Sequence, residues 1–239
     1  KLTGMADAVQ QQLEHASTYE GLPFIERLSL LVEHEQLSRE QRKQARLVKQ
    51  ARLKLQATVQ EVDYQSARNL ERSQVANLAQ GEWLRRGQNL LITGPCGCGK
   101  TYLACALGYQ ACQQGHSTRY YRLPRLLLEL SQAKVDGSYA RLLGQLARIE
   151  LLILDDWGLE AVNAEQRNAL LEIMDDRYGK YSTVVVSQLP TEEWYASLGD
   201  NTLADAILDR LMHNAHRLSL KGESMRKRRS ELTQSEHSS

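Results

Sequence analysis

The strongest constraint on the fold is a glycine-rich segment at residues 94–101, which reads Gly-Pro-Cys-Gly-Cys-Gly-Lys-Thr. It matches the pattern G-x-x-x-x-G-K-[ST] at every fixed position. Glycines let the backbone curl so that its N–H groups converge on phosphate oxygens, and a following helix adds the positive end of its dipole. A strand is expected before the segment at Asn89–Thr93 and a helix after it at Lys100–Gln114. This setting argues against a glycine-rich turn without a ligand and predicts a P-loop that binds ATP.

All residues of the loop and the residue after it are candidates for contact with the nucleotide. They are Gly94, Pro95, Cys96, Gly97, Cys98, Gly99, Lys100, Thr101 and Tyr102. In loops of this kind the lysine ammonium reaches the β- and γ-phosphates, and the hydroxyl binds Mg²⁺. We therefore predict a catalytic role for Lys100 and a metal-ligand role for Thr101.

Two adjacent carboxylates end a second apolar strand, Leu151–Asp155. This is the Walker B pattern, in which Asp155 would hold Mg²⁺ and Asp156 would orient and deprotonate the attacking water. Most AAA+ proteins have Glu at the second position, and the shorter Asp leaves slow hydrolysis open. In the alternative interpretation, Asp156 only ends the strand and another carboxylate, such as Glu160, acts as the base.

Apolar strands alternate with helices from residue 88 onward, which predicts an α/β fold with a parallel central sheet covered by helices on both faces. Together with the P-loop and the second acidic strand, this layout resembles the AAA+ three-layer sandwich. The expected strands are Asn89–Thr93, Thr118–Arg122, Leu151–Asp155, Thr183–Ser187 and His216–Leu220, and the helices between them are Lys100–Gln114, Pro124–Lys134 and Ala164–Tyr178. Residues 1–80 contain no strand-like run. Their expected helices are Ala6–His15, Phe24–His34, Ser38–Thr58, with Ser38 in a capping box, and Ser66–Gln80. We predict a helical N-terminal domain at 1–64, an ATPase domain at 65–222 and a tail at 223–239.

The composition sets limits on the class of protein. The 239 residues carry a formal net charge of only +1, so local charge must carry any argument for nucleic acid. No apolar run approaches ~20 residues, and no leader is recognised, so a soluble cytoplasmic protein is expected. The cysteines lack metal-site spacing and are expected to be free thiols. They are Cys96, Cys98, Cys105 and Cys112.

A basic run at residues 39–54 has a local net charge of +6, from seven basic residues and one acid, Glu40. On a helix it would present a cationic face, which binds phosphate backbones without reading sequence. A solvated helix face is the alternative. The absence of aromatic residues argues against base stacking and favours duplex DNA. The predicted DNA contacts are Arg39, Arg42, Lys43, Arg46, Lys49 and Lys54.

Three polar residues late in the chain are further candidates. Gln188, with Ser187 beside it, ends a strand where a sensor would read the γ-phosphate. Arg210, on a predicted helix, is a candidate to reach the nucleotide of a neighbouring subunit, and a salt bridge is its alternative role. Arg226 is a candidate second sensor or nucleotide contact, although its basic run, 226–229, equally suits DNA or solvent.

Several segments together resemble the IstB family, the ATPase helpers of bacterial insertion-sequence transposases. They are residues 81–95, Gly-Lys-Thr-Tyr-Leu-Ala at 99–104, Leu-Leu-Ile-Leu-Asp-Asp-Trp-Gly at 151–158, Ser-Gln-Leu-Pro at 187–190, Ile-Leu-Asp-Arg-Leu at 207–211 and Gly-Glu-Ser-Met-Arg at 222–226. The resemblance covers the whole chain. The related DnaC-type helicase loaders share this layout but usually carry Asp-Glu at Walker B.

The resemblance implies an ATPase that binds DNA without strong sequence preference, oligomerises on it with ATP and recruits a transposase. By motif match, the ATPase roles fall to Lys100, Thr101, Asp155, Asp156, Gln188 and Arg210. Two alternatives stay open, a helicase loader and an ATP-switched DNA scaffold that hardly hydrolyses. A small-molecule kinase is a more distant alternative.

Overall fold

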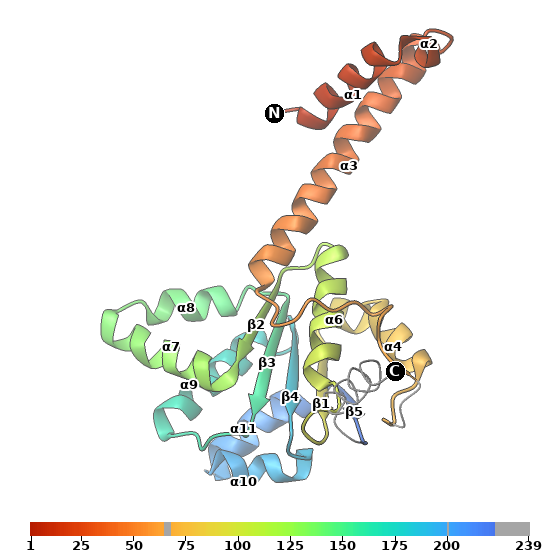
Figure 1. Cartoon of the computed structure of the whole chain (residues 1–239). Coiled ribbons are helices and arrows are strands. Elements are labelled where there is room, and N and C mark those ends of the chain that lie inside the picture. Colours follow the sequence, from red (N-terminus) through yellow and green to blue (C-terminus); the bar gives the residue numbers. More distant parts are fainter. Residues whose placement is uncertain (65–67, 200, 223–239) are drawn as a thin grey trace, which may run out of the picture.

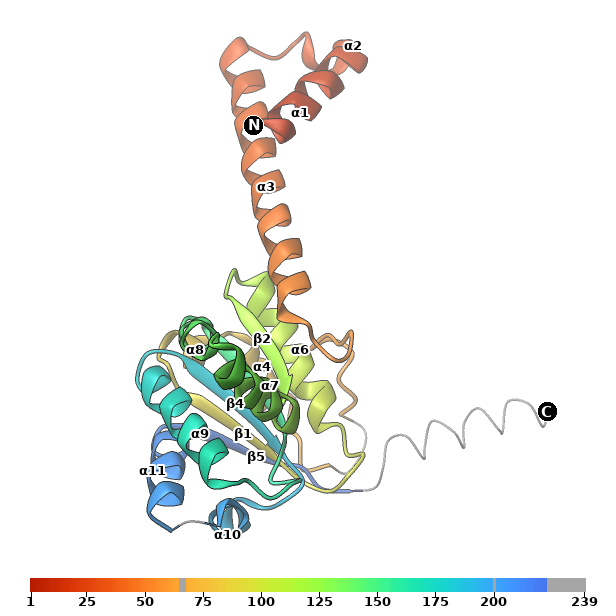
Figure 2. The same ribbon diagram turned by 90° about the vertical axis from the view of Figure 1, so that its left-hand side faces the viewer.

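The computed structural model describes residues 1–64, 68–199 and 201–222 and confirms the predicted α/β class. A five-stranded sheet forms the body of the molecule, and a long helix projects from it (Figures 1 and 2). None of the described helices is both long enough and apolar enough to cross a membrane.

The sheet is parallel throughout, with the order β2-β3-β4-β1-β5. Its strands are β1 (Asn89–Thr93), β2 (Thr118–Arg122), β3 (Leu151–Trp157), β4 (Ser182–Ser187) and β5 (Ala215–Ser219). Each lies within two residues of the predicted strand. In β1, β3 and β4 the reason is a buried run of Leu, Ile or Val, which is typical of strands in a sheet that is covered on both faces. The carboxyl ends of β1, β3 and β4 therefore lie side by side.

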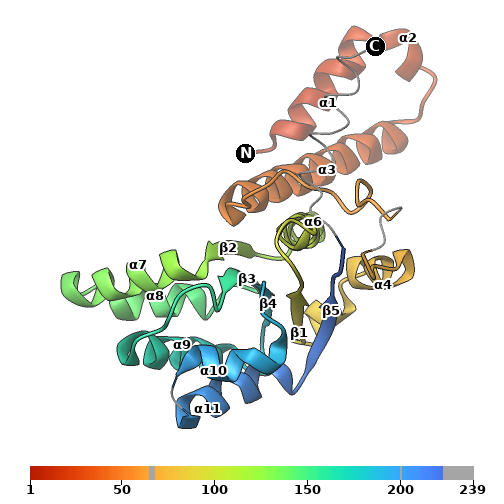
Figure 3. The same ribbon diagram turned by 60° about the horizontal axis from the view of Figure 1, so that its bottom comes forward.

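Alternate residues of each strand enter two separate hydrophobic cores. In β1, Leu90 and Ile92 pack on one face of the sheet and Leu91 packs on the other. This alternation follows from the two-residue period of a strand. The first face is covered by α4 (Arg72–Ala79), α5 (Glu82–Arg85) and α6 (Lys100–Gln113). The second is covered by α7 (Leu123–Asp136), α8 (Tyr139–Leu146), α9 (Ala164–Arg177), α10 (Trp194–Leu198), which the short 3₁₀ helix η1 (Thr191–Glu193) precedes, and α11 (Asn201–Met212) (Figure 3).

The N-terminal region contains α1 (Thr3–Glu14), the short α2 (Ala16–Tyr19) and the 28-residue α3 (Phe24–Ala51). The prediction of two helices, Phe24–His34 and Ser38–Thr58, was wrong, because α3 runs through residues 35–37 without a break. No glycine or proline interrupts this span, so nothing stops the helix. Ser38 is consequently not an N-cap. The helix ends at Arg52, whose φ of 49° is left-handed.

Helix α1 packs along the outer half of α3, and Gly4 lies where the two helices meet. A Cβ at Gly4 would lie 2.6 Å from the Ser38 Cβ, so only glycine permits this approach. Glu35 accepts a hydrogen bond from the Met5 backbone N–H at 3.0 Å, and His34 Nδ1 lies 2.8 Å from the Gly4 carbonyl oxygen. A sequence search for caps misses these contacts, because the polar groups of α3 serve a neighbouring helix.

The inner end of α3 is anchored on the sheet domain. Leu47 and Ala51 are buried against Cys112 of α6. Beyond α3, Ala57 and Val62 belong to the core on the α6 face. This part of the chain therefore packs with the sheet domain, and the predicted domain boundary at residue 64 stays a prediction.

Candidate functional site

The phosphate loop joins β1 to α6, as the sequence predicts. Three of its glycines have positive φ: 143° at Gly94, 83° at Gly97 and 95° at Gly99. Positive φ is where glycine is favoured over other residues. A Cβ at Gly94 would also collide with the Leu220 carbonyl oxygen, just after β5. Glycine is therefore required here both by the turn and by the close approach of the Leu220 backbone.

Lys100 lies in the first turn of α6 and is only 7% exposed. Its Nζ donates to the carbonyl oxygens of Gly94 and Pro95, both at 2.7 Å. The ammonium is thus held inside the curl of the loop by the loop's own backbone. A nucleotide phosphate bound by the loop would meet this charge together with the backbone N–H groups.

Asp155 lies directly under the loop and is 2% exposed. Its Oδ2 accepts hydrogen bonds from the Thr101 hydroxyl at 2.9 Å and from the Tyr120 hydroxyl at 2.7 Å. Burial and the hydrogen bond to this carboxylate raise the pKa of Tyr120, so the phenol stays protonated and acts as a donor. The structure thus brings together the two predicted Mg²⁺ ligands, whose oxygen donors suit that ion.

Lys54 also reaches Asp155, with Nζ at 3.8 Å from Oδ2. The sequence placed Lys54 on the cationic helix face. That placement is wrong, because α3 ends at Ala51 and the chain then turns toward the phosphate loop. The residue lies between the long helix and the nucleotide site.

Asp156 follows on β3 in a left-handed conformation, with φ of 63°. The pairing of β3 with β4 shifts register between Leu154 and Trp157, which accommodates the extra residue as a bulge. The Asp156 side chain is 17% exposed and accepts a 2.5 Å hydrogen bond from Arg122 Nε at the end of β2. Glu160, the alternative base, lies on the exposed loop that follows and lines the same small cavity as Asp156.

Gln188 is exposed at the carboxyl end of β4, between the loop on β1 and the carboxylates on β3. Its neighbour Ser187 is buried, and its hydroxyl donates to the Trp157 carbonyl at 2.8 Å and accepts from the Leu189 N–H at 3.0 Å. Ser187 is therefore occupied by structural bonds. Of the two, Gln188 is the side chain placed to contact a ligand, and its sensor role stays a prediction.

Arg210 lies in the last turn of α11, at the opposite end of the sheet. The Asn89 side chain, at the start of β1, donates to the Arg210 carbonyl oxygen at 3.1 Å. The five residues of β1 span about 16 Å, which separates Arg210 from the loop of its own chain. Its guanidinium pairs with Asp175 of α9 and donates to the Ala206 carbonyl at 2.7 Å. The salt bridge considered as the alternative role of Arg210 is thus present, with Asp175 as the partner.

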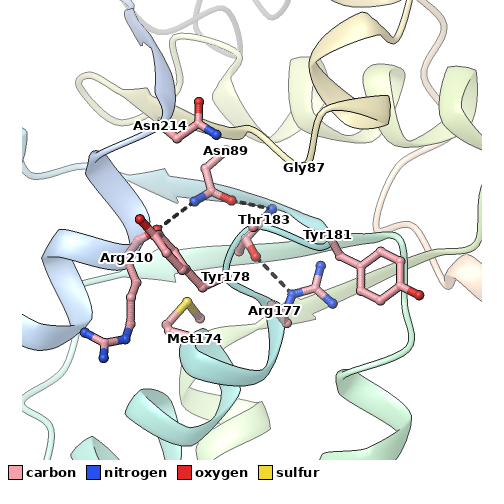
Figure 4. Close-up of a pocket in the computed structure, with 10 residues that line it drawn as sticks. Gly87, Asn89, Met174, Arg177, Tyr178, Tyr181, Thr183, Arg210 and Asn214 are labelled. Atoms are coloured by element: carbon pink, nitrogen blue, oxygen red, sulfur yellow. Dashed lines mark hydrogen bonds between the residues drawn. The ribbon is translucent and has the colours of Figure 1, made fainter.

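A cavity of about 120 Å³ lies beside Arg210 at this amino end of the sheet (Figure 4). Its wall includes Asn89, Arg177 and Thr183, and these three residues are joined by hydrogen bonds that run across the strand starts. The phosphate loop contributes nothing to it. The cavity is therefore separate from the predicted nucleotide site.

The basic stripe of α3 consists of Arg39, Arg42, Lys43, Arg46 and Lys49, all of them exposed. Glu35, one turn earlier, pairs with Arg39 at 2.6 Å and with Arg42 at 3.7 Å. This acid lies outside the run used to count charge, so the net charge of the stripe is lower than the sequence predicted. Its contact with DNA stays a prediction.

Three residues near the site escaped the sequence interpretation: Tyr120, Arg122 and Arg68. Tyr120 and Arg122 come from β2, and only the β2–β3 register, which pairs Arg122 with Asp155, brings them to the carboxylates. Tyr102, predicted as a nucleotide contact, donates its hydroxyl to Glu61 at 3.2 Å. Arg226 lies outside the described residues.

Comparison with known proteins agrees with this geometry. The model of the family described as IstB-like ATP binding protein matches residues 1–233. A protein of Sinorhizobium fredii named as an insertion sequence ATP-binding protein is 49% identical over 226 residues, 95% of this chain and 92% of its own length. The ATP-binding protein of insertion sequence IS21 from Pseudomonas aeruginosa is 35% identical over 95% of this chain and 85% of its own length.

Two solved structures share the fold. The helicase loader DnaC aligns with a TM-score of 0.60 at 20% identity, over 69% of this chain and 97% of that one. DnaI aligns with a TM-score of 0.60 at 22% identity, over 69% of this chain and 91% of that one. The match to the family model and the two relatives in sequence settle the membership: the chain belongs to the IstB-like ATP-binding proteins.

Proposed function

We propose that this protein is an ATPase of an insertion sequence that oligomerises with ATP on duplex DNA, largely without sequence preference, and recruits or stimulates a transposase there. The observation that carries the ATPase part is the 2.9 Å hydrogen bond between Thr101 of the phosphate loop and Asp155 of β3. It joins the two elements that hold Mg²⁺ in P-loop ATPases. The relatives named for insertion sequences support the biological setting.

Each candidate residue has its own role in the proposed ATP hydrolysis. Bound Mg²⁺ would neutralise negative charge on the β- and γ-phosphates, and Thr101 and Asp155 would hold it. Lys100 stabilises the same phosphates by charge, Asp156 orients and deprotonates the attacking water, and Gln188 contacts the γ-phosphate. The Arg122 pair holds the Asp156 carboxylate, so the water reaches its base only when that pair opens. Slow hydrolysis, stimulated by DNA or a partner, follows from this arrangement.

Arg210 acts on the nucleotide of a neighbouring subunit in this proposal. It lies at the end of the sheet away from its own loop, and its ion pair with Asp175 is partly exposed, at 30% and 48%. Exposed ion pairs are weak, so a phosphate can replace Asp175. An arginine supplied in trans would stabilise charge on the transferred group and would make hydrolysis depend on assembly.

Mixing two inactive variants tests the shared site. Lys100→Ala removes the loop lysine and Arg210→Ala removes the trans arginine, and each alone should lose hydrolysis. In a random one-to-one mixture, about a quarter of the interfaces pair an intact loop with an intact arginine, so activity should return to that order. Arg148→Gln, an exposed arginine change, is the control. No recovery in the mixture, with both variants assembling normally, would rule out Arg210 acting in trans.

The stripe on α3 is the proposed DNA surface. Arg46 and Lys49 make no ion pair among the described residues, so their charge is available to phosphates. The double variant Arg46→Gln with Lys49→Gln should weaken duplex binding and lower the salt dependence by about two phosphate contacts. The matched control neutralises Arg85 and Arg86, which pair with Glu82 away from the stripe. Equal losses in both double variants would remove the stripe as the site.

The identity of the base has a direct test. Asp156→Asn should abolish hydrolysis while ATP binding persists, and Glu160→Gln should leave hydrolysis within about twofold. The reverse ranking would assign the base to Glu160 instead.

Two other functions remain to be separated from this one. The fold shared with DnaC and DnaI supports a helicase loader. Pull-down with the transposase of the same element, compared with the host replicative helicase, discriminates. The Arg122–Asp156 pair supports an ATP-switched scaffold, which predicts no phosphate release with or without duplex DNA.

A further inference from the structure

Arg68 is a buried cation beside the phosphate loop. It is 6% exposed, and its Nη1 donates to the Cys98 carbonyl oxygen at 3.2 Å. Its Nε and Nη2 are buried and have no hydrogen-bond partner among residues 1–64, 68–199 and 201–222. None of the ion pairs formed by those residues includes Arg68. Such a group is costly, because burying a charge without a partner loses its hydration.

The backbone around Arg68 is fixed against the edge of the sheet. The Lys221 N–H donates to the Arg68 carbonyl at 2.9 Å, and the Asn69 side chain donates to the Ser219 carbonyl at 3.0 Å. The guanidinium lies on the turn of the loop at Cys98 and Gly99. A Cβ at Gly99 would be 2.7 Å from Nη1, so glycine makes room for the arginine as well as for the turn.

Arg177 shows how this fold provides hydrogen-bond partners for a buried arginine with a structural role. It is 1% exposed, and its three nitrogens donate four hydrogen bonds to Thr183 Oγ1 and to the carbonyls of Leu146, Ile149 and Ser182, at 2.5 to 3.1 Å. Arg68 has one such bond, and two of its three nitrogens have no partner among the described residues. A guanidinium with two unpaired donor nitrogens is suited to phosphate oxygens, and the adjacent loop has the sequence and shape that bind a polyphosphate.

We propose that Arg68 is a nucleotide-binding residue whose Nε and Nη2 donate hydrogen bonds to a phosphate oxygen of the bound ATP. The proposal rests on ATP binding at the loop and needs neither hydrolysis nor DNA. ATP completes the hydrogen bonding of Arg68 and supplies its counter-charge. The segment before α4 is thereby part of the nucleotide site, although no motif marks it.

Arg68→Gln tests the proposal by calorimetric titration of the full chain with Mg²⁺–ATP and with inorganic tripolyphosphate. Loss of hydrogen bonds to a charged group should weaken both ligands on the order of tenfold to a hundredfold. Tm without ligand should not fall, because an uncompensated buried charge has been removed, whereas the rise in Tm on adding ATP should shrink. The control is Arg72→Gln, an exposed arginine at the start of α4, four residues after Arg68.

Three results would overturn the proposal. Unchanged affinity for ATP, with a lowered Tm without ligand, would make Arg68 a structural residue. Weaker ATP with unchanged tripolyphosphate would assign the contact to base or ribose. If Arg68→Gln does not fold, Arg68→Lys provides the test. Lysine keeps the positive charge but lacks the planar guanidinium with its several N–H donors, so this variant should still bind both ligands more weakly. Wild-type affinity of Arg68→Lys for both ligands counts against the proposal. A wild-type chain that binds ATP without turnover would remove the ATPase proposal and leave this test intact.

Discussion

The two ends of the parallel sheet each hold a buried arginine, and the two arginines differ in how many of their nitrogens have hydrogen-bond partners. At the amino end, all three nitrogens of Arg177 donate hydrogen bonds within the chain, four bonds in total, and burial lowers the pKa of Arg177. At the carboxyl end, Arg68 leaves two donors unused next to a loop built for phosphate. For these two arginines the difference fits two roles: every nitrogen of Arg177 has a partner in its own chain, as in a structural residue, and the unpaired nitrogens of Arg68 are those that we propose the nucleotide completes.

The cavity in Figure 4 supports the same distinction. It lies at the amino end, where Asn89 bridges the Thr183 N–H at 2.8 Å and the carbonyls of Arg210 and Leu211 at 3.1 Å. Its polar wall is thus largely occupied by bonds that hold strand starts to α11. An enclosed volume alone says less about function than the unused donors at the other end.

The largest expected effect belongs to the amino end. Arg177→Gln would remove most of these four bonds and leave several buried carbonyl oxygens without donors. We expect a loss of about 3–5 kcal/mol in the free energy of unfolding. Urea unfolding measures it, and Arg148→Gln, which is exposed, is the control. The comparison fails if Arg177→Gln and Arg68→Gln destabilise the protein without ligand equally.

A second prediction concerns Asp155 at the carboxyl end. Asp155→Asn keeps the shape of the side chain but removes the charge that would hold Mg²⁺. Hydrolysis should fall about a hundredfold or more, while the fold persists because the hydroxyls of Thr101 and Tyr120 can rotate. Phosphate release and Mg²⁺-dependent ATP binding are the measurements. Tyr120→Phe, which removes one hydrogen bond to the same oxygen, should retain most of the ATP binding.

The third prediction frees Arg210 from its partner. Asp175→Asn should change stability by less than about 1 kcal/mol, because the pair is partly exposed. Hydrolysis by the assembled protein should rise by up to about fivefold, the rate equivalent of that energy. Steady-state turnover at saturating ATP measures it, with the neighbouring exposed Asp176→Asn as control. A fall in turnover would mean that Asp175 positions the arginine.

The sequence predicted the parts of this molecule that depend on local pattern. The strands and the phosphate loop follow from apolar runs such as Leu90–Ile92 and from glycine positions, which act over a few residues. The continuity of α3 was missed because Ser38 looks like a cap until its contact with Gly4 is known. Lys54 was misplaced because the helix ends at Arg52, which adopts a left-handed conformation although it is not a glycine. Such outcomes depend on tertiary contacts that no local pattern records.

The smallest effect returns to the amino end, where Glu150 joins the starts of β2 and β3. Its carboxylate lies 2.8 Å from His116 Nδ1 and accepts from the Ser117 N–H at 2.7 Å and the Ser117 hydroxyl at 3.0 Å. Partial burial raises the pKa of Glu150, but these hydrogen bonds outweigh it and lower the pKa below the ordinary 4.5. A carboxyl group whose pKa is lower in the folded protein stabilises the fold at a pH above its pKa in the unfolded chain. This contribution is lost as the pH falls through its pKa in the folded protein.

Glu150→Gln should therefore cost less than about 1 kcal/mol at neutral pH, since the side chain is 37% exposed and solvent screens it. The difference in stability from wild type should shrink below about pH 4.5, because the Glu150 carboxyl then becomes protonated in both the unfolded and the folded protein. Thermal unfolding across this range measures the difference, and a His116→Asn background repeats the comparison without the imidazole. A difference that grows steadily as the pH falls below 4.5 would contradict the assignment. In that case the contacts from His116 and Ser117 would not be what stabilises the Glu150 carboxylate in the folded protein.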